Sequence, residues 1–214
     1  MQMLDVDKTK RMLLRYKLPF CKSVLAKNQK DCVKAAKVVR WPVVLKIVSP
    51  DIIHKSDVGG VVVGVESERE LTDAYDKMIK AVKRKKPKAR IKGVLVQHMC
   101  SGEEVIIGVK RDEQFGAVIM FGLGGIFVEV LKDVSFRVCP VDRLQAEGMI
   151  KEIKGFALLT GARGKNAVNI KDLANLIVKV SKMVMANKKI AELDFNPVIV
   201  DEKKAIIADA RIII

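Results

Sequence analysis

A histidine in a polar loop is the first residue of this sequence with a clear chemical use. His54 is one of two histidines and lies in the stretch Ser49–Asp57, between two apolar runs. Its imidazole is largely neutral near pH 7, and a ring nitrogen can accept a phosphoryl group. Asp51 or Asp57 can hold the other ring nitrogen, and Lys55 can steady an incoming phosphate. An exposed loop histidine without a chemical role is the alternative interpretation.

A lysine interrupts the apolar run Val43–Val48. Burying the ammonium group of Lys46 is costly unless it meets an anion, so a contact with phosphate is one interpretation. The other is that the side chain reaches solvent from the edge of a sheet. The second histidine, His98, stands between residues of strand character and Met99, which is typical of a hinge or core position.

The C-terminal end of the chain predicts a β-hairpin around the polar turn Asp201–Lys204. If the turn is centred between its second and third residues, Asn196 faces Asp209, with Cβ atoms about 4.5–5.5 Å apart. An amide oxygen and a carboxylate so placed can share one Mg²⁺, which prefers hard oxygen ligands. Asp194 faces Arg211 in the same register. A turn residue and a strand-end charge without a metal are the alternative.

Two glycine-containing segments have the character of anion-binding loops. The segment Phe121–Gly125 has three glycines, which let backbone N–H groups approach an anion, but it lacks the spacing of a dinucleotide or P-loop motif. Glu129 and Asp133 follow it. The basic stretch Gly161–Lys165 is consistent with a phosphate contact or with an ordinary exposed connection.

Helical and strand patterns alternate along the whole chain, which predicts an α+β fold of two lobes. We place the division after residue 96, with a hinge near Gln97–Met99. Ser67 and Glu70 have the spacing of a capping box. The expected helices are Asp7–Tyr16, Asn28–Val39, a long helix from Ser67, Asp142–Ile153 and Asp172–Ala186. The expected strands are Val43–Val48, Val61–Val65, Val94–Gln97, Val105–Val109, Ala117–Phe121, Val128–Leu131, Ser135–Val138, Ala191–Val200 and Ala205–Ile213.

Composition excludes several classes of protein. The four cysteines stand singly, without the spacing of a zinc site or a disulfide framework. A net charge of +15 suggests a nucleic-acid partner, but 5% aromatic residues leave little for bases to stack on. We interpret the basic run Lys83–Arg90 as a solvated helix end and expect no nucleic-acid partner. No signal peptide and no membrane span is evident, which predicts a cytoplasmic protein without a membrane partner.

Several segments together resemble one known family. VVLKIVSPDIIHKSDVGGV (Val43–Val61) is similar to the lysine strand and histidine loop of the β subunits of ADP-forming acetyl-CoA synthetases, in the NDP-forming acyl-CoA synthetase family. SGEEVIIGVKRDEQFG (Ser101–Gly116), FGLGGIFVEVLKDVSFRVCP (Phe121–Pro140) and ELDFNPVIV followed by Asp209 also match. The resemblance covers nearly the whole chain in the right order. It implies an ATP-grasp fold, with two α/β lobes and a nucleotide bound between them.

The resemblance also implies roles for individual residues. The first lobe is expected in residues 1–96, with Lys46 and the His54 loop, and the second in residues 97–214, with the metal-binding hairpin. His54 would become the phosphohistidine. The nucleotide would be bound by Lys46 at its phosphates, Gln97, His98 and Met99 at the adenine, Glu104 at the ribose, and Gly124 and Gly125 in the glycine loop. Asn196 and Asp209 would hold Mg²⁺. The candidate supporting residues of the site as a whole are Lys55, Asp57, Glu129, Arg163 and Asp194.

The reaction of the family converts acyl-CoA, ADP and phosphate into acid, ATP and CoA. The resemblance therefore implies ATP or ADP and Mg²⁺ as ligands, and a CoA-binding α subunit as the partner in a hetero-oligomer. Transfer between distant sites requires the His54 loop to move. A carboxylate ligase that forms an acyl phosphate would share Lys46, Glu104 and the metal pair, but it would not need His54. A regulatory subunit that senses nucleotide is a further alternative.

Overall fold

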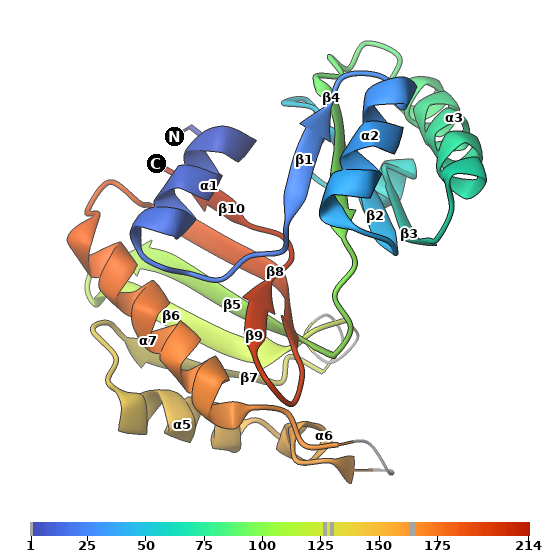
Figure 1. Cartoon of the computed structure of the whole chain (residues 1–214). Coiled ribbons are helices and arrows are strands. Elements are labelled where there is room, and N and C mark those ends of the chain that lie inside the picture. Colours follow the sequence, from blue (N-terminus) through green and yellow to red (C-terminus); the bar gives the residue numbers. More distant parts are fainter. Residues whose placement is uncertain (1, 126–127, 129–130, 163–165) are drawn as a thin grey trace. The chain divides into compact units, whose positions relative to one another are not determined.

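The computed structural model describes residues 2–125, 128, 131–162 and 166–214, and the chain divides into two compact units (Figure 1). The larger unit comprises Met1–Phe20 and Ser101–Ile214, and the smaller unit comprises Cys21–Cys100. The boundary expected after residue 96 therefore falls four residues later, and the first 20 residues belong with the C-terminal half. The reason is that Leu13 and Leu18 are buried in the core of the larger unit.

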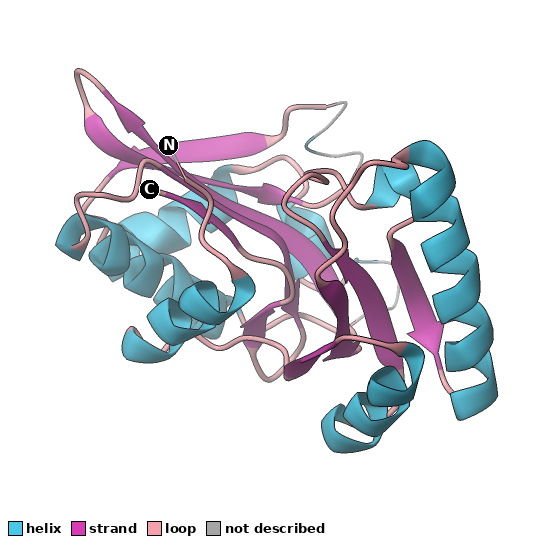
Figure 2. Ribbon diagram, turned by 90° about the horizontal axis from the view of Figure 1, so that it is seen from above, coloured by secondary structure: helices cyan, strands magenta, loops and turns pink. Residues whose placement is uncertain are grey.

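The smaller unit is a four-stranded antiparallel sheet with helices on one face (Figures 1 and 2). Apolar residues of both helices and of alternate strand positions form one buried core, which includes Val43, Leu45 and Ile47. The sheet order is β1 (Ser23–Ala26), β4 (Gly93–His98), β2 (Val43–Val48) and β3 (Val61–Val65). The helices are α2 (Gln29–Val39), the short 3-10 turn η1 (Ser56–Val58) and α3 (Glu68–Lys85).

The predicted capping box at the start of α3 is only half formed. The Ser67 hydroxyl accepts a hydrogen bond from the Glu70 N–H at 3.2 Å, as expected. The Glu70 carboxylate, however, accepts from the N–H of Glu66 at 2.9 Å instead of that of Ser67. One more N–H group before the helix is thereby satisfied.

The larger unit contains a six-stranded antiparallel sheet and one large core. Its main path is β10 (Arg211–Ile213), β8 (Glu192–Val200), β5 (Glu103–Asp112), β6 (Gly116–Leu123) and β7 (Val134–Val138), and β9 (Ala205–Ile207) pairs with β8. The helices are α1 (Val6–Arg15), α5 (Arg143–Glu152), α6 (Phe156–Leu159) and α7 (Ile170–Ala186). The inner part of the predicted strand Val128–Leu131 lies outside the described residues. No described helix is long and apolar enough to cross a bilayer.

The C-terminal hairpin has the predicted register, but its returning strand is broken. Val200 pairs with Ala205 around the turn, and Asp194 pairs with Arg211, as predicted. The prediction of one strand through residues 205–213 is wrong, because the chain leaves the ladder between β9 and β10. There, the N–H groups of residues 208 and 209 both donate to the carbonyl oxygen of Pro197, at 3.0 and 3.3 Å. The break thus lies opposite the middle of β8.

Candidate functional site

In the smaller unit, two of the predicted nucleotide-binding residues lie on the same face of the sheet. Val44 pairs with Gln97 and Lys46 pairs with Leu95 on the neighbouring strands β2 and β4. Because residues alternate between faces, Lys46 and Gln97 lie on the face away from α2 and α3. Both are nearly buried, with exposed fractions of 7% and 5%. An ammonium group and an amide on the helix-free face of the sheet suit an anionic, hydrogen-bonding ligand.

His98 and Met99 are held differently from Gln97. His98 belongs to the other strand face, and its Nδ1 lies 3.0 Å from the carbonyl oxygen of Arg40, at the end of α2. The Met99 N–H donates to the carbonyl oxygen of Pro42 at 2.9 Å. Any contact of a ligand with that N–H therefore requires a change from this structure. His98 is only partly buried and is not part of the core of the smaller unit, so its role at a hinge stays a prediction.

The His54 loop carries its histidine at an exposed position between two buried anchors. Ile52 and Val58 are 5% and 6% exposed and belong to the core of the smaller unit. His54 itself is exposed, and the part of the chain that the structure describes offers its imidazole no hydrogen bond. Its ring nitrogens are therefore accessible to a reacting phosphate.

A glycine fixes the loop against the strand that carries Lys46. The Gly60 carbonyl accepts from the Ile47 N–H, and the Gly60 N–H donates to the Lys55 carbonyl, both at 2.7 Å. A Cβ atom at Gly60 would lie 2.4 Å from Cγ2 of Ile47. Only glycine permits this approach, and it holds the end of the His54 loop beside β2.

The aspartate before His54 does not orient the imidazole. The Asp51 carboxylate accepts from the backbone N–H of Arg90 at 2.8 Å and from its guanidinium at 2.9 and 3.1 Å. These hydrogen bonds and the positive charge lower the pKa of Asp51 to about 2. The interpretation of Asp51 as the histidine's partner is wrong, because both carboxylate oxygens are used by Arg90.

The end of the loop is tied down by the same basic region. The Lys85 ammonium group donates to the backbone carbonyl of Asp57 at 2.6 Å. Lys85 and Arg90 were expected to be a solvated helix end and loop, and their contacts with the His54 loop were missed. The local sequence does not indicate the pairing of Asp51 with Arg90, because the two residues are 39 positions apart.

In the larger unit, the predicted ribose-binding glutamate lies next to the glycine loop. The Gly124 N–H donates to the Glu104 carbonyl at 2.7 Å, and a Cβ atom at Gly124 would lie 3.0 Å from that of Glu104. Glu104 is exposed and alternates with the buried Val105, so it lies on the sheet face away from α5 and α7. Gly125 follows with a φ of +63°, a conformation that favours glycine.

The predicted metal ligands lie around the break in the returning strand of the C-terminal hairpin. Asp194 and Asn196 are alternate residues of β8 beside the buried Phe195, and Asp209 lies opposite them at the break in the returning strand. Burial raises the pKa of Asp194, and the nearby carboxylate of Asp209 raises it further, against the effect of Arg211. Two carboxylates and an amide in this arrangement fit a hard divalent cation.

Other residues near this region have structural partners. The Asp133 carboxylate accepts from the N–H groups of Lys154 and Gly155, both at 2.7 Å, which fixes the start of α6. Within the described ranges no group of three or more His, Cys, Asp or Glu side chains is placed to hold a metal. A cation would thus take further ligands from nucleotide and water. Glu129 and Arg163, predicted as supporting residues, lie outside the described residues.

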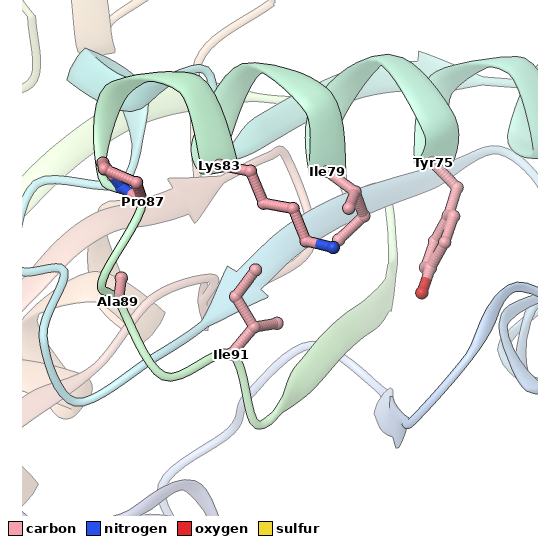
Figure 3. Close-up of a pocket in the computed structure, with 6 residues that line it drawn as sticks. All are labelled: Tyr75, Ile79, Lys83, Pro87, Ala89 and Ile91. Atoms are coloured by element: carbon pink, nitrogen blue, oxygen red, sulfur yellow. The ribbon is translucent and has the colours of Figure 1, made fainter.

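A separate surface pocket of about 610 Å³ lies between α3 and the loop that leads to β4 (Figure 3). Tyr75, Ile79 and Lys83 project from the helix toward Ile91 of that loop. None of the predicted site residues lines it. The pocket is therefore distinct from the residues that the sequence assigned to nucleotide and phosphate.

Comparison with known proteins gives consistent matches over the full length. A family model described as an ATP-grasp domain matches residues 1–214. The β subunit of acetate–CoA ligase [ADP-forming] I of Pyrococcus furiosus is 46% identical over 206 residues, which cover 96% of this chain and 89% of the relative.

Solved structures match equally well. One is dinucleotide forming acetyl-coenzyme A synthetase 1 of Ca. Korarchaeum cryptofilum, in complex with coenzyme A, Ca-AMPCP and HgCl+. The match has a TM-score of 0.95 at 46% sequence identity, and it covers 100% of this chain and 93% of that chain. Another structure of that enzyme holds coenzyme A and Mg-AMPPCP, with its phosphohistidine segment pointing towards the nucleotide binding site. Its TM-score is 0.84 at 42% identity, with 99% of this chain and 92% of that chain covered.

Proposed function

The chain belongs to the ATP-grasp family, as a β subunit of the ADP-forming acetate–CoA ligases, and we propose that His54 carries phosphate between a nucleotide and an α subunit. The observation that supports this most is the position of the His54 loop. An exposed imidazole follows directly on the strand that holds the buried Lys46, and no side chain of the described residues occupies its ring nitrogens.

Each unit would present nucleotide-binding residues on the helix-free face of its own sheet. Lys46 and Gln97 present a cation and an amide on one of these faces, and Glu104 and Gly124 lie together on the other. Lys46 would contact the phosphates, because its ammonium group can donate charge-assisted hydrogen bonds to phosphate oxygens. Glu104 is an acceptor for sugar hydroxyl groups. Gln97 would meet the adenine together with the backbone of Met99.

The metal would be Mg²⁺, held by the side-chain oxygens of Asn196 and Asp209, with Asp194 in support. When bound, the ion neutralises negative charge on the nucleotide phosphates. The chain's own contribution is to hold these ligands at fixed register positions on β8 and at the break after β9. Burial is the main cause of the raised pKa of Asp194, and the carboxylate of Asp209 adds to it.

The chemical step forms one bond and breaks one. A neutral ring nitrogen of His54 attacks the terminal phosphorus of ATP, the N–P bond forms, and the P–O bond to ADP breaks. In the direction of ATP synthesis the same bonds exchange in reverse. Lys55, next in sequence, supplies positive charge near the transferred group. The protein mainly aligns the reactants and neutralises charge, as phosphoryl transfer requires.

The other end of the relay would lie on a CoA-binding α subunit. There, acyl-CoA and phosphate would exchange to give an acyl phosphate that phosphorylates His54. A loop that serves two sites has to leave one of them, and in this chain the contacts of Asp51 with Arg90 and of Asp57 with Lys85 must then break or move with it.

The test is reconstitution of the chain with an α subunit. His54→Ala should reduce ATP formation from acetyl-CoA, ADP and phosphate by at least about 1,000-fold, because the relay has no substitute nucleophile. ADP binding should be retained. Ser56→Ala, in the same exposed loop, should behave as the wild type. Full activity of His54→Ala would overturn the relay. Acyl phosphate formed by the isolated chain from ATP and acetate would instead favour the carboxylate ligase.

A further inference from the structure

Two cysteines at the ends of the smaller unit lie in immediate contact. The sulfur atoms of Cys21 and Cys100 are 2.7 Å apart, and no disulfide joins them. Even two carbon atoms in contact are 3.5–4.0 Å apart, and sulfur is larger. A disulfide requires an S–S distance of 2.03–2.05 Å, so bond formation needs the two sulfurs to approach by only a fraction of an ångström.

The strand pairing of the smaller unit brings these cysteines together. β1 and β4 are antiparallel neighbours, with Ser23 opposite Gln97. The pairing continues past the strand ends, where the His98 N–H donates to the Lys22 carbonyl at 2.9 Å. The chain therefore enters and leaves this unit side by side, and Cys21 and Cys100 are its first and last residues. Their proximity follows from the sheet rather than from a mobile loop.

We propose that Cys21 and Cys100 form a dithiol site that low-molecular-weight disulfides oxidise to an intramolecular disulfide. Cys100 is partly exposed, so its thiolate attacks one sulfur of the small disulfide, forms a mixed disulfide and releases one small thiol. The buried Cys21 then attacks the Cys100 sulfur, the protein disulfide forms, and the second small thiol leaves. Two protein thiols and one disulfide are thereby converted into one protein disulfide and two thiols.

The other two cysteines are poor competitors for this chemistry. Cys32 is fully buried in the core of the smaller unit, and burial together with the charge of Asp31 raises its pKa to about 12. Burial also raises the pKa of Cys139 in the larger unit. A thiol must ionise and be reached before it attacks a disulfide, so neither reacts readily. They serve as matched control positions in the same chain.

The bond would close a loop that contains the whole smaller unit. Closing a long loop restricts the unfolded chain far more than the folded one, in which the ends already touch. The melting temperature of the oxidised protein should therefore rise by roughly 5–15 °C, and a reducing thiol should reverse the rise. This inference does not depend on the proposed phosphate relay.

The experiment uses the full chain and oxidised glutathione. After incubation, free thiols are alkylated, and the protein is digested and analysed by mass spectrometry. The expected product is a peptide pair linked through Cys21 and Cys100, formed equally by Cys32→Ser and Cys139→Ser. In Cys21→Ser the reaction should stop at a stable glutathione adduct on Cys100, because no second thiol resolves it. Alkylation of both Cys21 and Cys100 in the treated wild type would overturn the proposal, as would an unchanged melting temperature once the bond has formed.

Discussion

Arg90 binds the Asp51 carboxylate through its backbone N–H at 2.8 Å and its guanidinium at 2.9 and 3.1 Å, and so ties the start of the His54 loop to the segment after α3. This pair fixes a loop whose histidine must stay accessible. Because Asp51 is bound to Arg90, it does not hold the imidazole of His54 in this structure. The orientation of His54 is thus set by the two ends of its loop.

The Asp51–Arg90 contact should depend on pH in the acid range. Asp51 has a lowered pKa of about 2, so its contribution to the folded state is fully present above its unfolded pKa of about 4 and is lost as the pH falls toward 2. NMR titration of the Asp51 carboxyl carbon should show a midpoint near 2. In Arg90→Gln the midpoint should move up toward the ordinary value. A wild-type midpoint near 4 would mean that the contact does not persist in solution.

Lys46 should contribute to nucleotide affinity. Lys46→Met keeps most of the volume of this buried side chain and removes its charge. Loss of a charge-assisted contact of about 1.5–3 kcal/mol predicts ATP binding weaker by roughly 10–100-fold in calorimetry. The exposed Lys92 serves as the control, and Lys92→Met should bind ATP normally. Equal affinities in both variants would remove Lys46 from the site.

The C-terminal hairpin should determine the dependence on Mg²⁺. Asp209→Asn and Asn196→Ala should each raise the Mg²⁺ concentration needed for half-maximal nucleotide binding by about 10-fold, since each removes one hard oxygen ligand or its charge. Glu202→Gln removes a charge in the turn of the same hairpin, where Glu202 bonds Asn166, and should leave the Mg²⁺ requirement unchanged. An equal shift in Glu202→Gln would mean that a loss of charge anywhere on the hairpin, rather than the loss of a ligand, changes the Mg²⁺ requirement.

Gly60 should be intolerant of a side chain. A Cβ atom there would lie 2.4 Å from Ile47 Cγ2 and 2.9 Å from the Lys55 carbonyl, so Gly60→Ala should cost about 1–3 kcal/mol of unfolding free energy. Denaturant unfolding measures this loss. Gly148→Ala, on α5 with its nearest neighbour 3.8 Å away, should be neutral or slightly stabilising. A stable Gly60→Ala protein would show that the loop end is less constrained than the structure indicates.

The sequence predicted features that depend on local periodicity. The even-numbered turn at residues 201–204 set the hairpin register, so the pairing of Asp194 with Arg211 followed from counting. The helix from Ser67 was found because its N-cap residue accepts an N–H group of the first turn. These signals act over a few residues, and tertiary contacts do not override them.

Features that depend on distant contacts were not predicted. The strand Ser23–Ala26 is short and partly exposed, and it is recognisable only through its pairing with β4. The assignment of the first 20 residues to the larger unit depends on Leu13 and Leu18 packing in a core formed late in the chain. The partner of Asp51 was missed for the same reason, because Arg90 belonged to a basic run with no local pattern.

Phosphorylation of His54 is the central claim, and intact-mass analysis tests it most directly. The purified chain is incubated with Mg²⁺ and ATP, and its intact mass is measured before and after treatment with mild acid. The His54→Ala variant is measured in parallel. We predict a single phosphoryl adduct of about 80 Da that is acid-labile and absent from the variant, as expected for phosphate on a ring nitrogen. An adduct that persists in His54→Ala, or no adduct in the wild type even with an α subunit present, would contradict the account.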